Sequence, residues 1–276
     1  MGDPQAKAGT AGQQLFARYA YGPNHLGYCG PADSAALFEL AATGQATDDV
    51  EAVAARFTGA WPYLCVLADL AGIADPLDER VVRAYWTGSS LLDGVNRTRF
   101  WRKLLDRIAA AGAGRYWGHL TPALLSEAMP THGFHVFGVY PWTRLLLPSA
   151  VDPNLAPADP GPALHVLDSC RIRWGRVTAV DGDHAVILGR HLTWDGYALR
   201  LGEEREDAVR LARAGKGFVT DARPGDWLTV HWDLACERLS ADQLWQLRRW
   251  TDWQLVVTNE RLAREADATA RAGAAR

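Results

Sequence analysis

The chain has 276 residues, of which 48% are hydrophobic and 22% charged, a balance typical of a soluble globular protein with a proper core. The net charge is −3 and no block of like charges occurs, which argues against non-specific electrostatic binding of nucleic acid. The cysteines (Cys29, Cys65, Cys170 and Cys236) are widely spaced, which excludes a disulfide framework or zinc ribbon. With no signal peptide and no run of about 18 apolar residues, we expect a cytoplasmic protein with reduced thiols.

The first half, residues 1–147, is predicted to be a mostly α-helical domain of unknown type. Apolar residues recur there at helical spacing between turns rich in glycine and proline. Residues 133–147 are aromatic and β-branched, and they fit either a buried strand or an interface segment. The predicted helices span residues 32–43, 48–57, 62–71, 78–92 and 97–111.

Five prolines within residues 148–163 forbid a continuous helix or a central strand, so this segment is predicted to be a stiff linker. Short strands and tight turns follow it, with hairpin signals at Asp181-Gly182 and Asp195-Gly196. Such closely spaced strands favour a small closed barrel. The predicted strands span residues 171–180, 184–192, 197–201, 207–212 and 227–232.

The end of the chain is predicted to form a helix followed by a flexible tail. Ser240 and Gln243 form a capping-box pair that starts a C-terminal helix. Residues 260–276 are rich in Ala and Arg and are predicted to form a flexible tail. The expected fold is therefore α+β: a helical N-terminal domain, a proline-rich linker, and an OB-like β-barrel with its C-terminal helix in residues 164–259.

Three short motifs follow one another along the second half of the chain. Residues 170–177 read CRIRWGRV, residues 181–183 read DGD, and residues 224–231 read PGDWLTVH before the C-terminal helix. Over about residues 164–250 this order resembles the HypC/HupF family of NiFe hydrogenase maturation chaperones, in which a Cys-x-x-x-Pro-Gly-x-Val start, a DG hairpin and a PGD…VH segment recur. The resemblance covers about a third of the chain, and the N-terminal half matches no family in this way.

The resemblance implies an accessory chaperone rather than an enzyme. Such a protein would handle an iron atom with cyanide and carbon monoxide ligands, the Fe(CN)2CO fragment, or dock the immature large subunit. Its implied partners are a HypD-like scaffold protein and the hydrogenase large subunit; neither nucleic acid nor a membrane is expected. Low-spin iron favours a soft thiolate at an accessible position, so Cys170 and His231 are the implied site for the transiently carried fragment.

This sequence departs from the family pattern at several positions. Cys170 follows 169 residues instead of an initiator methionine, Arg173-Trp174 stands in place of Ile-Pro, and Asp233-Leu234 in place of Gly-Phe. A non-catalytic adaptor that keeps a degenerate barrel and loses iron chemistry is therefore an alternative. The residues expected to meet a partner are Arg171, Trp174, Trp227 and Trp232.

A second candidate site lies in residues 18–31, RYAYGPNHLGYCGP, which we expect to form an ordered loop. His25 and Cys29 could ligate a metal there, with His132 and His135 as distant candidates to complete the shell. The alternative function is thus a metal- or haem-dependent enzyme. A purely structural loop is the favoured interpretation of this segment, because the spacing fits no established metal signature. A strand would turn His132 and His135 to opposite faces, whereas a helix would place them on one face; their surroundings favour a strand.

Overall fold

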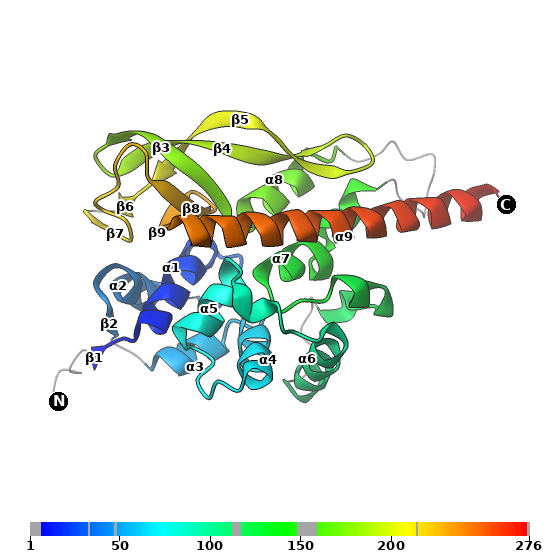
Figure 1. Ribbon diagram of the computed structural model, residues 1–276, viewed down its shortest axis with the longest axis horizontal. Coiled ribbons are helices and arrows are strands. Elements are labelled where there is room, and N and C mark those ends of the chain that lie inside the picture. The colour runs from blue at the N-terminus through cyan, green and yellow to red at the C-terminus, as the bar shows by residue number, and fades with distance from the viewer. Residues whose placement is uncertain are drawn as a thin grey trace.

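The computed structural model describes residues 7–32, 34–46, 49–111, 117–147, 159–213 and 215–274. Figure 1 shows the sheet along one side, helices α1 to α6 on the other, and the long helix α9 running lengthwise through the view. The predicted α+β class is confirmed as a set of helices, a five-stranded mixed sheet and a C-terminal helix. Most of the predicted linker, residues 148–158, lies outside the described residues.

The five predicted helices of the first half are present. The predicted helix over residues 78–92 is divided, because Gly88 adopts a left-handed conformation (φ +81°) against the ring of Trp250. The elements are α2 (Ala35–Thr43), α3 (Val50–Ala55), α4 (Trp61–Ala71), α5 (Glu79–Trp86), η1 (Ser90–Leu92), α6 (Arg97–Ala111), η2 (Trp117–His119) and η3 (Pro122–Glu127).

Helix α1 (Ala11–His25) corrects the prediction of a loop over residues 18–31. A capping box starts the helix, because the Gln13 amide donates to Thr10 Oγ1 (3.2 Å) and the Thr10 amide donates to Gln13 Oε1 (3.0 Å). Pro23 suggested a break, but it lies in the last turn and has no N–H to donate to the carbonyl of Tyr19. The Tyr19 carbonyl is therefore left available to a partner outside the helix.

The second half contains one five-stranded mixed sheet. Strands β3, β4 and β5 form an antiparallel meander, β8 pairs with β3 and β9, and β9 meets β5 at the single parallel pair Leu234 and Arg210. The predicted strands 197–201 and 207–212 are one continuous strand, β5. The strand bounds are β3 (Arg173–Asp181), β4 (His184–Trp194), β5 (Leu199–Arg210), β8 (Trp227–His231) and β9 (Leu234–Arg238), with two-residue ribbons β1 (Lys7–Ala8), β2 (Gln45–Ala46), β6 (Ala212–Arg213) and β7 (Lys216–Gly217).

The aromatic segment 133–147 is helical, which corrects the expectation of a strand. Thr131 caps its first turn by accepting a hydrogen bond from the Phe134 amide (3.1 Å). A further unpredicted helix leads into β3 and ends at Cys170. These elements are α7 (His132–Phe134), the π-helical turn η4 (His135–Val139), η5 (Pro141–Leu146) and α8 (Gly161–Cys170).

Helix α9 (Ala241–Ala274) begins at the predicted capping box and extends well past residue 259, where a flexible tail was expected. Arg261 explains the extension, because its guanidinium bonds Glu127 Oε1 (2.5 Å) and the Phe137 carbonyl (2.8 Å). Leu262 beside it is fully buried. Tertiary contacts therefore hold a segment whose composition alone predicts fraying.

A buried polar network fastens the helical half to the sheet. The Tyr19 hydroxyl of α1 donates to Glu237 Oε1 of β9 (2.6 Å), and Arg83 of α5 pairs with the same carboxylate (3.0 Å). One hydrophobic cluster continues from α1, α4 and α5 into β3, β8 and β9. The interface between the halves is thus part of the core.

Among the described residues, none of the helices combines the length and the apolar character needed to cross a bilayer.

Leu262→Ala tests the ordered second half of α9. We expect the free energy of unfolding to fall by about 2–5 kcal/mol, because a fully buried side chain leaves a cavity. Val256→Ala, on the same helix with a residue exposure of 57%, should change it by no more than about 0.5 kcal/mol. Urea unfolding followed by circular dichroism measures both, and equal small losses would contradict the packing of this segment.

Candidate metal site between the helical half and the sheet

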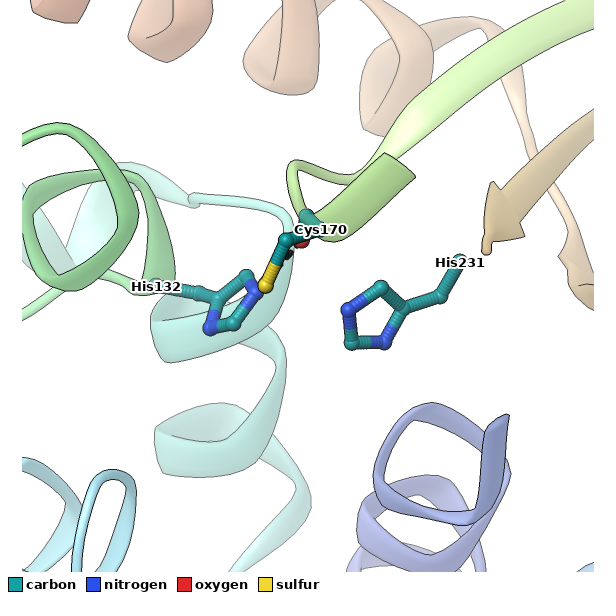
Figure 2. Close-up of side chains that lie close together, drawn as sticks. All are labelled: His132, Cys170 and His231. Carbon is teal, nitrogen blue, oxygen red and sulfur yellow. Dashed lines mark hydrogen bonds between the residues drawn. The ribbon is translucent and has the colours of Figure 1, made fainter. Parts of the chain in front are cut away.

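Three metal-ligating side chains from distant parts of the chain converge in the interior. His132 comes from α7, Cys170 from the last turn of α8, and His231 from the end of β8 (Figure 2). Each offers a ligand atom within 4.8 Å of those of the other two, and all three are buried. One thiol and two imidazoles are a ligand set suited to zinc, cobalt or iron.

These side chains face a small cavity of about 70 Å³ between the two halves. Its wall is mainly apolar and aromatic, so it excludes bulk water from the three polar groups. The lining residues are Pro23, Tyr28, Cys29, Phe57, Gly59, Ala60, Tyr85, Trp86, His132, His135, Tyr140, Trp142, Val166, Cys170, His231 and Trp232.

His231 is oriented by the backbone of α1. Its Nδ1 lies 2.7 Å from the Tyr19 carbonyl, the group that Pro23 leaves unbonded within the helix. A carbonyl only accepts, so Nδ1 carries the proton and Nε2 carries the lone pair. Nε2 is buried without a hydrogen-bond partner among the described residues. Burial lowers the pKa of His231 to about 4, which keeps the ring neutral and able to ligate a metal at pH 7.

His132 is held by two contacts. Nε2 lies 2.8 Å from the carbonyl of Cys170, and Nδ1 lies 3.4 Å from the Tyr85 hydroxyl, a long and therefore weak hydrogen bond. Burial and the neighbouring His231 lower its pKa well below the ordinary value. Both histidines are thus neutral, but only His231 has an uncommitted nitrogen.

Burial raises the pKa of the Cys170 thiol well above its ordinary value, so the thiol is protonated at pH 7. A bound metal would have to displace this proton, as coordination by cysteine requires. The side chain is 92% buried, since its residue exposure is 8%. The sulfur therefore lies inside the protein, in contrast to the accessible thiolate that the family resemblance implies.

A buried ion-pair network fixes the end of α8 that carries Cys170. Arg171 donates to Asp168 Oδ1 (2.9 Å) and to the Arg190 carbonyl (2.6 Å). His191 Nδ1 and the Leu192 amide donate to the same carboxylate, at 2.6 and 2.9 Å. Burial acts to raise the pKa of Asp168, but these donors and the Arg171 charge outweigh it and hold the pKa below its ordinary value.

The second predicted site is divided by the structure. Cys29 lines the cavity, whereas His25 lies outside it, stacked on Tyr21 and contacted by Arg213 through its Nε2. The structure therefore places the two side chains in different surroundings, and the His25/Cys29 pair stays a prediction. The reason is that His25 belongs to α1 and faces α2 and β6, while Cys29 lies in the loop after the helix.

His132 and His135 face the same cavity, because the segment is helical and residues three apart share a face. Reading this segment as a strand concealed His132 as a partner of Cys170. Thr131, a good N-cap residue two positions before Gly133, was the sequence signal for a helix start.

The residues expected to contact a partner are mostly internal. Arg171, Trp174 and Trp232 are buried, with the Arg171 guanidinium over the Trp174 ring (5.8 Å). Trp227 is partly exposed and carries Arg248 over its ring (4.8 Å). In this conformation the first three contribute to packing, and only Trp227 presents area to a partner.

The chain belongs to the DUF6390 family, which is described as a family of unknown function. The family pattern matches residues 8–265. The match spans both the helical half and the sheet. No curated protein and no solved structure matches the chain.

Asp168→Ala tests the support beneath Cys170. We expect a loss of about 3–5 kcal/mol in the free energy of unfolding, because Arg171 would keep its charge in the interior without the carboxylate that balances it. The contribution of Asp168 is complete above about pH 4 and is lost as acid protonates the carboxylate, since folding lowers its pKa.

The matched control is Asp233→Ala, whose side chain is 63% exposed and 3.6 Å from Arg210. It should cost less than about 1 kcal/mol. Urea unfolding of the unchanged protein and both variants at pH 7 and at about pH 2, below the unfolded-state pKa, measures both effects. A loss for Asp168→Ala at pH 7 no larger than that of the control would show that the network does not contribute to stability.

Proposed function

We propose that this protein binds a thiophilic transition metal through His132, Cys170 and His231, and that it does so as an accessory protein of NiFe hydrogenase maturation. The main observation behind this proposal is that one thiol and two neutral imidazoles converge on an apolar cavity, where His231 Nε2 is buried and unpaired. A buried nitrogen without a partner is costly, and a metal ion would satisfy it.

The ligand chemistry supports a metal that prefers sulfur and nitrogen donors. Three protein ligands leave coordination positions open, and small ligands brought by the metal could fill them. The cavity of about 70 Å³ suits diatomic ligands such as cyanide and carbon monoxide, and its apolar wall shields them from water. The Fe(CN)2CO fragment would in this proposal be the cargo.

The hydrogenase context rests on the HypC/HupF resemblance of residues 164–250. That resemblance supports an OB-like barrel for the five-stranded sheet and aligns Cys170 and His231 with the family's cysteine and motif histidine. A HypD-like scaffold or the immature large subunit would be the partner. Because the sulfur lies in the interior, transfer to such a partner would require the cavity to open.

Metal binding is the first test. Purified apoprotein titrated anaerobically with Co2+ should show sulfur-to-cobalt charge-transfer absorption. Cys170→Ser should lower this absorption by at least about half, and His231→Gln should weaken binding more than His132→Gln, because His231 has the uncommitted nitrogen. Affinity should rise at least about tenfold per pH unit between pH 6.5 and 8.5, because the metal displaces a thiol proton.

Cys65→Ser and His184→Gln are the matched controls, since neither residue lines the cavity. Both should bind Co2+ as the unchanged protein does. Absence of charge-transfer absorption in the unchanged protein, or undiminished absorption in Cys170→Ser, would refute the metal site.

Hydrogenase maturation is the second test. In a host that requires this protein for hydrogenase activity, Cys170→Ala should fail to restore activity, whereas Cys65→Ala should restore it. Failure with retained binding of the large subunit would support a carrier role for the thiol. Full activity of Cys170→Ala would instead favour an adaptor without iron chemistry.

A further inference from the structure

The segment between α1 and α2 supplies both a second sulfur and a cover for the cavity. Cys29 and Tyr28 line the cavity from this loop, and neither belongs to the cluster of His132, Cys170 and His231. The loop has left-handed glycines at Gly27 (φ +78°) and Gly30 (φ +79°), so its two ends turn sharply on either side of Tyr28 and Cys29.

Cys29 is held in place through its backbone. The buried Asn24 side chain donates to the Cys29 carbonyl (2.7 Å) and to the Pro31 carbonyl (2.6 Å). Cys29 is partly exposed as a residue, yet burial of its thiol raises the pKa to about 12. Cys29 and Cys170 line the same cavity, from the loop after α1 and from the end of α8.

Tyr28 closes the cavity from outside. Its ring stacks on the indole of Trp232, with the centroids 4.1 Å apart and the planes 16° from parallel. Tyr28 is 50% exposed and also lines the cavity, so its ring lies between the cavity and the solvent. Trp232 is held in a left-handed conformation (φ 61°), which is rare for a bulky residue, by hydrogen bonds from its amide to the Ser169 carbonyl (2.9 Å) and to its carbonyl from Arg173.

We propose that Cys29 is a fourth ligand for a bare divalent metal in this cavity, and that the Tyr28–Trp232 stack is the cover through which the metal enters and leaves. The inference rests on the proposed metal site and names the residue that completes it. Two thiolates and two imidazoles make a tetrahedral set for Co2+, Zn2+ or Fe2+. The unpaired His231 Nε2 points to a ligand at the same place.

Co2+ alone, under anaerobic and reducing conditions, is the probe for the fourth ligand. Cys29→Ser should retain about half of the sulfur-to-cobalt absorption and release the metal to a chelator roughly tenfold or more faster. Cys65→Ser should match the unchanged protein. Full absorption in Cys29→Ser, with loss in Cys170→Ser, overturns the fourth ligand and leaves the three-residue site standing. No Co2+ binding in the unchanged protein overturns both.

Tyr28→Ala tests the cover. It should speed both Co2+ uptake and release about three- to tenfold, with absorption unchanged, because stacking is lost and the ligands are not. Tyr28→Phe should behave as the unchanged protein. In metal-free protein, Tyr28→Ala should also speed alkylation of Cys170 to a similar extent, measured by peptide mass spectrometry. Unchanged rates in both measurements overturn the cover, whether or not metal binds.

Discussion

The hydrogen bond from His231 to the Tyr19 carbonyl is the interaction on which the site depends. It exists because Pro23 removes the amide that would otherwise bond this carbonyl within α1. It joins the helical half to the sheet, and it determines which imidazole nitrogen faces the cavity. Gly22 permits the approach, since a Cβ there would lie 3.1 Å from the His231 carbonyl oxygen. A backbone irregularity near a helix end thus fixes the tautomer of a residue more than two hundred positions away.

The second constraint is electrostatic. The cavity holds neutral groups, with both imidazoles and the Cys170 thiol uncharged because burial disfavours their charged forms. Charge is kept beside the cavity, in the Asp168–Arg171 pair, where each charged group has several partners. On the proposed function, a divalent cation would bring charge into the cavity and the departing thiol proton would offset part of it.

The two halves contribute unequally to the site. The sheet half carries the Cys170 and His231 of the hydrogenase-chaperone resemblance, and the helical half adds His132 and the wall that contains Tyr28 and Cys29. On the proposed function, the helical half would enclose a metal fragment that the resemblance alone would place at an open surface. Such enclosure suits storage or protection of a reactive centre, with release dependent on movement of the wall.

The sequence by itself determined the α+β class, the five helical stretches of the first half, the Asp181-Gly182 hairpin and the capping box at Ser240, because each depends on periodicity or turn chemistry within a few residues. It also singled out Cys170, His231 and Cys29 as candidate ligands. Helix α1, the helical form of residues 132–146 and the extension of α9 required tertiary contacts that override local composition, such as Arg261 with Glu127. Only the tertiary structure decided that His132 lies beside Cys170, that His25 lies outside the cavity that Cys29 lines, and that the Cys170 sulfur is buried. These relations depend on how two halves of the chain pack against each other.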